Sequence, residues 1–191
     1  MKAIPLHAAR ALLDKYVQAK DNNCPELIHE AFAQAASLTF SIDTDTISFP
    51  PKAEGAQAIA TTLVSEFSRT FDRCRTYYIG EPVPKDNTIV IPWLVLMRET
   101  AAHTLRAGKG FYRWSFVEEQ DGAYHIASLH IHIERMDSLA DPEAAALTAL
   151  QAPLPYPWLP AEVLKAGIEG CIAVQPSLAI LQTLAQPAQS R

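Results

Sequence analysis

One set of side chains capable of chemistry is a pair of histidines near the end of the most strand-like stretch of the sequence. His130 and His132 alternate with aliphatic residues, so in a strand they share one face, and Glu134 extends their row. Such a row can move protons, and two histidines at this spacing can bind a metal ion if a third ligand is present. No third ligand is evident, so no metal is predicted. The competing interpretation places both histidines on an outer face, at a subunit contact or in water.

Two aspartates and a tyrosine are the other candidates for proton transfer. Asp43 and Asp45 directly follow a short predicted strand at residues 37–42, where a partly desolvated carboxylate can act as a general base. The ordinary alternative is a turn aspartate that bonds to its own backbone. Tyr16 lies on the apolar side of a predicted helix. A buried phenol there can stabilise negative charge on a carbonyl oxygen, or simply bond to a backbone group.

Aromatic residues in the predicted sheet suggest a surface for a hydrophobic ligand. Tyr112, Trp114 and Phe116 alternate along one strand, and Trp93 lies on the neighbouring strand. A surface of this kind suits a planar or polycyclic molecule, whereas the alternative is ordinary core packing against Phe67 of a long helix. The sequence shows no phosphate-binding glycine loop and no Ser-His-Asp or Cys-His signature, and no cofactor is predicted.

These residues are positioned by a sheet whose centre is predicted from residues 88–136. Aromatic and β-branched residues dominate three runs, at 88–100, 105–118 and 124–136, and Asp121-Gly122 predicts a tight turn before the last run. The preceding patterns predict helices at 8–20, 25–33 and 55–71, and short strands at 37–42, 46–49 and 74–79.

The chain changes character after this sheet. A helix is predicted after Asp141, an extended proline-rich segment at 153–160 carries Tyr156 and Trp158, and two short helices follow at 161–168 and 176–184. The apolar residues of these helices need burial. We therefore divide the chain into a domain at 1–138 and an extension at 139–191, which packs on that domain or on a dimer mate.

Composition excludes several classes of protein. The 191 residues are 49% hydrophobic and 19% charged, and the net charge is −5 with no basic block. Nucleic acid and membrane partners are therefore not expected. Three widely spaced cysteines do not suggest a disulfide framework, and the first residues lack the apolar core of a signal peptide, so a cytoplasmic location is expected.

The order of the elements, with several short segments, resembles the NTF2-like superfamily and within it the SnoaL-like proteins. The segments are KYVQA from Lys15, LIHEAFA from Leu27, ASLTF from Ala36 and EGAQAI from Glu54. The resemblance covers roughly residues 8–136. It implies an α+β cone in which a curved sheet wraps around a long helix, encloses a mostly apolar pocket and often forms a dimer through its outer face.

The resemblance also assigns expected roles. Tyr16 falls where steroid isomerases carry a tyrosine that donates to the oxyanion, and Tyr112 aligns with the second donor. Phe40 falls at the position of the catalytic base and cannot take a proton. The same alignment turns the aliphatic residues beside His130 and His132 toward the pocket. Asp43, Asp45 or a histidine would then have to move the proton.

The function expected from these features is binding of a small hydrophobic or aromatic molecule by a homodimer. Trp93, Trp114, Phe116, Phe40 and Phe67 would line the pocket, and cofactor-free isomerase, dehydratase or cyclase chemistry would be possible there. The alternative is a ligand-binding or structural dimeric module without chemistry. The fold by itself does not choose between them.

Overall fold

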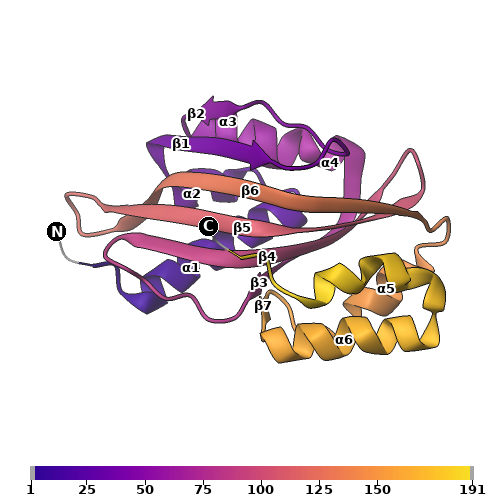
Figure 1. The fold of residues 1–191 in the computed structure, drawn as a ribbon. Helices are drawn as coiled ribbons and strands as arrows, with labels where there is room; N and C mark the ends of the chain where they lie inside the picture. The colour runs from indigo at the N-terminus through magenta and orange to yellow at the C-terminus, as the bar shows by residue number, and fades with distance from the viewer. Residues whose placement is uncertain (1–2, 190–191) are drawn as a thin grey trace.

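One curved, seven-stranded sheet organises the chain, with helices on both of its faces (Figure 1). The protein is described by a computed structural model that covers residues 3–189. The strand order is β2-β1-β6-β5-β4-β3-β7, with β1 parallel to β6, β3 parallel to β7 and all other neighbours antiparallel. The strands are β1 (Phe32–Ile42), β2 (Lys52–Glu54), β3 (Phe71–Ile79), β4 (Thr88–Glu99), β5 (Thr104–Glu118), β6 (Tyr124–Ala140) and β7 (Trp158–Leu159).

The three long central strands confirm the sequence prediction. Strands β4, β5 and β6 form an antiparallel meander, and β5 and β6 pair along almost their whole length. The turn between them uses the predicted pair. Gly122 adopts a φ of 83°, which favours glycine, and the Asp121 carboxylate accepts a bond from the amide of Ala123.

Helices on the concave face fill the interior of the cone. The helices are α1 (Leu6–Asp21), α2 (Glu26–Ala31), α3 (Ala56–Ala60), the π-helical turn η1 (Thr61–Ser65) and α4 (Phe67–Thr70). The last three form the long helix predicted at 55–71. An extra residue enters at η1, where the Glu66 amide bonds to the Thr61 carbonyl five residues back. As a result Ile59, Leu63, Val64 and Phe67 are all buried in one core.

The predicted strand at 46–49 is wrong. Residues 43–51 form an irregular loop, and the strand that pairs with β1 is β2, which begins after Pro51. Two adjacent prolines lack the amide donors that a ladder needs, so pairing can start only beyond them. The loop instead turns Ile47 and Phe49 onto the core, where the Phe49 ring stacks on Phe40 with ring centroids 4.6 Å apart.

The C-terminal extension packs on the opposite, outer face of the sheet. Its helices, α5 (Ala145–Gln151), α6 (Ala161–Val174) and the 3₁₀ helix η2 (Pro176–Ala185), lie beside β3, β4 and β5 (Figure 1). They bury a second apolar cluster, separate from the cone interior, against Tyr77, Leu94, Leu96 and Leu105. Strand β7 extends the sheet edge by pairing with β3. Helix α6 continues to Val174, past residue 168, where the sequence predicted that this helix ends.

Candidate functional site

The first candidate site is a small cavity inside the cone. Its volume is about 30 Å³, enough for a water molecule or two but not for a polycyclic ligand. The expected residues Tyr16, Tyr112, Phe40, Phe67 and Trp93 all line it. The remaining walls are aliphatic and aromatic, and the loop residues Ile47 and Phe49 close one side.

Two buried donors on the cavity wall have no acceptor within residues 3–189. They are the Tyr16 hydroxyl and the Trp93 indole N–H, in side chains that are 0% and 3% exposed. Tyr16 is edge-on to Tyr112, with ring centroids 5.8 Å apart, and Tyr112 stacks on Trp93 at 5.5 Å. Burial raises the pKa of Tyr16 to about 12, despite the opposing charge of Lys20, so the phenol is a neutral donor at pH 7.

Lys20 also lines this cavity, although it was not among the residues expected there. Its Nζ donates to Thr76 Oγ1 at 2.9 Å, lies 3.5 Å from Asp21 Oδ1 and sits 4.3 Å above the Phe67 ring. Burial opposes its charge, but Cys74 and Asp21 outweigh that cost and raise the pKa of Lys20. The sequence signal that could have found it is the helical spacing of four residues from Tyr16, which places both on one face.

The other expected site residues do not line the cavity. Trp114 and Phe116 are buried in the same core as the cavity but do not line it. The Trp114 ring lies edge-on to the Tyr16 ring, with centroids 4.9 Å apart. Asp45 is exposed, and Asp43 lies on the outer side of the sheet beside His132. The two aspartates are therefore not at the cavity.

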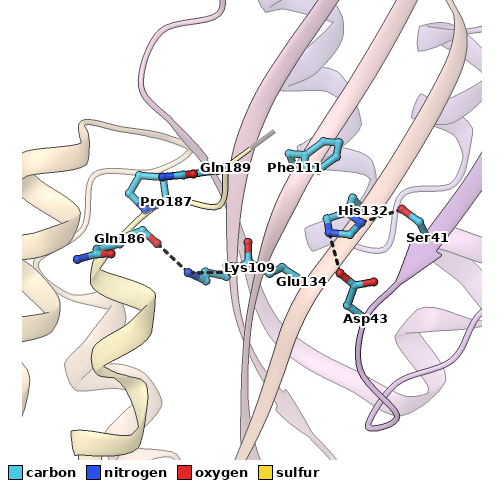
Figure 2. A pocket seen from close by; sticks show the side chains of 9 residues that line it. All are labelled: Ser41, Asp43, Lys109, Phe111, His132, Glu134, Gln186, Pro187 and Gln189. Atoms are coloured by element: carbon cyan, nitrogen blue, oxygen red, sulfur yellow. Dashed lines mark hydrogen bonds and ion pairs between the residues drawn. The ribbon is translucent and has the colours of Figure 1, made fainter. Parts of the chain in front are cut away.

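A second, larger candidate site lies on the outer face. It is a groove of about 530 Å³ between β1, β5, β6 and the C-terminal segment after η2. Figure 2 shows Ser41, His132 and Asp43 on one side and Gln186, Pro187 and Gln189 on the other. The Phe111 ring stacks on His132, with centroids 4.7 Å apart.

A chain of hydrogen bonds passes from β1 to β6 and back and reaches the groove at Ser41 and His132, where an ion-pair contact with Asp43 extends it. Thr39 Oγ1 lies 2.8 Å from His130 Nδ1, and His130 Nε2 lies 2.9 Å from Ser41 Oγ. Ser41 Oγ is also 2.8 Å from His132 Nδ1, and His132 Nε2 is 3.5 Å from Asp43 Oδ2. Both histidines thus face outward, as the resemblance predicted, while Ile131 and Ile133 point into the core.

Lys109 closes the far end of the groove, and its charge is already paired. Its Nζ donates to the carbonyl oxygens of Thr183 and Gln186 and lies 3.1 Å from Glu134 Oε1. This lysine fastens the segment after η2 to β5 and β6. The dashed line in Figure 2 between Lys109 and Gln186 marks one of these bonds.

Three further observations concern classes of site and protein. No cluster of three or more histidine, cysteine or acidic residues within 3–189 has the geometry to hold a metal ion. In the same range, no helix has both the length and the apolarity to cross a membrane. Cys24, Cys74 and Cys171 are free thiols, and burial raises the pKa of Cys74 to about 12.

Comparisons with known proteins bear on the fold. No protein-family model matches the sequence, and no curated protein matches it significantly. Solved structures do match. The protein LinA shares 13% identity with this chain at a TM-score of 0.58, over 70% of this chain and 88% of LinA.

Two other structures agree. An NTF2-like superfamily protein from Salmonella enterica serovar Typhimurium is 14% identical, with a TM-score of 0.53 over 63% of this chain and 84% of its own. A ketosteroid isomerase-like protein from Erwinia carotovora atroseptica is 11% identical, with a TM-score of 0.53 over 68% of this chain and 96% of its own. At these identities the likeness concerns the fold, and the sequence-based resemblance is confirmed at that level: the chain has the α+β cone of the NTF2-like superfamily.

Proposed function

We propose that the protein binds a small hydrophobic molecule carrying an acceptor oxygen inside the cone, and that no chemistry takes place there. The observation that carries this proposal is the pair of unpartnered donors, Tyr16 Oη and Trp93 Nε1, on the wall of an otherwise apolar cavity. A buried donor without an acceptor costs about 1–3 kcal/mol. A ligand oxygen between these groups would recover that cost, and the aromatic walls would supply the apolar contact.

We favour ligand binding without chemistry over catalysis because the residues that line the cavity include no proton acceptor. Within the described chain, the ionisable side chains that line it are Tyr16, Tyr112 and Lys20. Burial raises the pKa of both tyrosines, and the pKa of Lys20 is raised as well, so all three hold their protons at neutral pH. Isomerase, dehydratase or cyclase chemistry requires a base, and the expected candidates Asp43 and Asp45 lie elsewhere.

The size of the cavity implies that the ligand is either very small or enters by displacing part of the wall. The loop at residues 43–51 is the part best suited to move, since it forms no β-ladder and contributes only the half-buried Ile47 and Phe49 to the core. Its middle is bonded to the sheet at Thr46, whose hydroxyl donates to the Met136 carbonyl and whose own carbonyl accepts from Arg106. Displacing Phe49 from its stack on Phe40 would join the cavity to the surface hollow on the other side of Phe49.

The test is native mass spectrometry of the purified protein, followed by titration with matched ligands. Phenol and 2-naphthol carry an oxygen, whereas benzene and naphthalene do not, and binding is followed by tryptophan fluorescence. We expect Tyr16→Phe to weaken the phenols about tenfold, the worth of one hydrogen bond, and to leave the hydrocarbons unchanged. We expect Phe49→Ala to admit 2-naphthol more readily. Failure of both the native protein and Phe49→Ala to bind any of the four would contradict the proposal.

A further inference from the structure

We propose that Ser41 is a nucleophile that takes an acyl group from small, uncharged esters in the outer groove. The groove lies on the opposite face of the sheet from the cone cavity, so this activity is independent of ligand binding in the cone. The geometry that carries the proposal is the short contact of the Ser41 hydroxyl with His132, whose other ring nitrogen faces Asp43. A nucleophile beside a base that a third group orients is the general arrangement for covalent catalysis.

The Asp43 carboxylate favours one direction along these contacts. It lies 3.5 Å from His132 Nε2 and so favours the tautomer with the proton on Nε2, which leaves Nδ1 as an acceptor for the Ser41 hydroxyl. Ser41 Oγ can in turn accept from His130 Nε2–H, and His130 Nδ1 accepts from the Thr39 hydroxyl. Burial lowers the pKa of His130, which favours the neutral ring that this direction needs. The Ser41 proton therefore points at a base that is free to take it.

The side chains that line the groove disfavour an anionic substrate, although Arg113 lies beside His130 on the same face of the sheet. The Asp43 side chain is 63% exposed and presents a carboxylate to the groove. The Lys109 ammonium cannot offset it, since Glu134 and two backbone carbonyl oxygens already contact that group. A phosphate ester or a carboxylate would be repelled, whereas an uncharged ester would not. The stacked Phe111 ring and Pro187 provide apolar surface for its acyl or alcohol part.

The step balances without a further reagent. Ser41 Oγ attacks the ester carbonyl carbon, the new C–O bond pushes an electron pair onto the carbonyl oxygen, and the Ser41 proton passes to His132 Nδ1. Collapse of this intermediate breaks the bond to the leaving alcohol, which takes the proton from His132. Water then attacks the acyl group by the same proton route, giving a carboxylic acid and free Ser41.

The donor that we assign to the developing oxyanion is His130 Nε2–H, which lies 2.9 Å from Ser41 Oγ. The oxyanion is the former carbonyl oxygen of the ester, bonded to the carbon that Ser41 Oγ attacks, and it forms close to this N–H. One imidazole donor is weaker than the paired backbone donors of efficient hydrolases, so slow turnover is expected. Covalent labelling is consequently the sharper measurement.

The experiment treats the full-length protein with a biotinylated alkyl fluorophosphonate, which modifies activated serines, and locates the label by peptide mass spectrometry. We expect label on Ser41 and slow release of 4-nitrophenolate from 4-nitrophenyl acetate. Ser41→Ala should abolish both, and His132→Gln should slow labelling at least about tenfold, as loss of a general base does. Ser128→Ala is the matched control, since its hydroxyl lies on the same face but bonds to Ser115 with no imidazole partner.

Asp43 is a positioning residue, and its variants separate that role from a structural one. Asp43→Asn keeps the shape but can donate to His132 Nε2, which moves the ring proton to Nδ1 and blocks acceptance from Ser41. Labelling should fall at least about tenfold, and Asp43→Glu should restore part of it. The proposal is overturned if the native protein, with an unchanged melting curve, takes no label on Ser41. It is equally overturned if His132→Gln and Asp43→Asn label at the native rate.

Discussion

At the scale of single residues, Gly110 shows how closely the central strands are packed. It lies opposite Ile133, beside a bulge that follows Lys109, and pairs with Trp93 on the other neighbouring strand. A Cβ atom on Gly110 would overlap the carbonyl oxygen of His132 and would stand 2.8 Å from the Trp93 ring. Backbone cannot yield as a flexible side chain can, so only glycine fits here.

We therefore expect Gly110→Ala to be strongly destabilising. Overpacking of this kind costs about 1–3 kcal/mol and occasionally more. Gly170→Ala is the control, since Gly170 lies inside α6 and a methyl group there would meet no atom within 4 Å, so alanine should add about 1 kcal/mol. Chemical denaturation measures both changes. Equal stabilities for the two variants would show that β5 is not packed against β6 and Trp93 as described.

At the scale of elements, the C-terminal extension behaves as part of the fold. Beyond its apolar contacts, the segment between α5 and α6 is bonded to α1: Tyr156 donates to Asp21 Oδ2 at 2.8 Å and Trp158 donates to Asp14 Oδ1 at 2.7 Å. The Arg10 guanidinium also lies 4.3 Å from the centre of the Trp158 ring. The extension thereby ties together the outer cluster and the helix that carries Tyr16.

We expect Leu164→Ala to destabilise the whole protein and not the extension alone. Leu164 is 1% exposed within the outer cluster, and such a truncation costs about 2–5 kcal/mol. The exposed Val174 at the end of the same helix is the matched control, where alanine should change stability by less than about 0.5 kcal/mol. Both variants are made in a Trp158→Phe background, which removes the tryptophan of the extension, so that fluorescence of Trp93 and Trp114 reports unfolding of the other cluster. If the fluorescence transition of Leu164→Ala had the same midpoint as that of the Trp158→Phe protein, the extension would unfold separately from the rest of the chain.

At the scale of the whole molecule, the two faces of the sheet carry different kinds of surface. The concave face is closed by helices and a loop around a small cavity, whereas the outer face is divided between the extension and a polar strip. That strip contains Thr39, Ser41, His130, His132 and Arg113, none of which adds much apolar area. The homodimer expected through the outer face would have to form on this remaining surface.

We expect the protein of 191 residues to be a monomer at micromolar concentration. The extension already covers the apolar half of the outer face, so the main driving force for self-association there is satisfied within one chain. Light scattering after size exclusion should give a mass near 21.0 kDa. A mass of twice that value would support a homodimer and contradict this prediction. If Arg113→Glu then returned the mass to that of a monomer, the dimer contact would lie on the polar strip.

The elements of the central sheet and the faces of its strands were predictable from the amino-acid sequence. The choice of face for His130 and His132 and the inward position of Tyr112 came from the resemblance to NTF2-like proteins, whereas local alternation and the Asp121-Gly122 turn were enough to predict three long strands and to group the two histidines on one face. Local patterns suffice for this because the two faces of a strand are decided by neighbouring residues in the chain.

Which of these residues meet became apparent only in the folded chain. Ser41 and Asp43 reach His132 through the parallel pairing of β1 with β6, across about ninety residues of chain, and no local pattern encodes that register. The same holds for the buried charge of Lys20 beside the cone cavity, and for the extension that covers the outer face. Long-range register and packing depend on the fit of whole surfaces, and this is why the strands were predictable while the two sites they form were not.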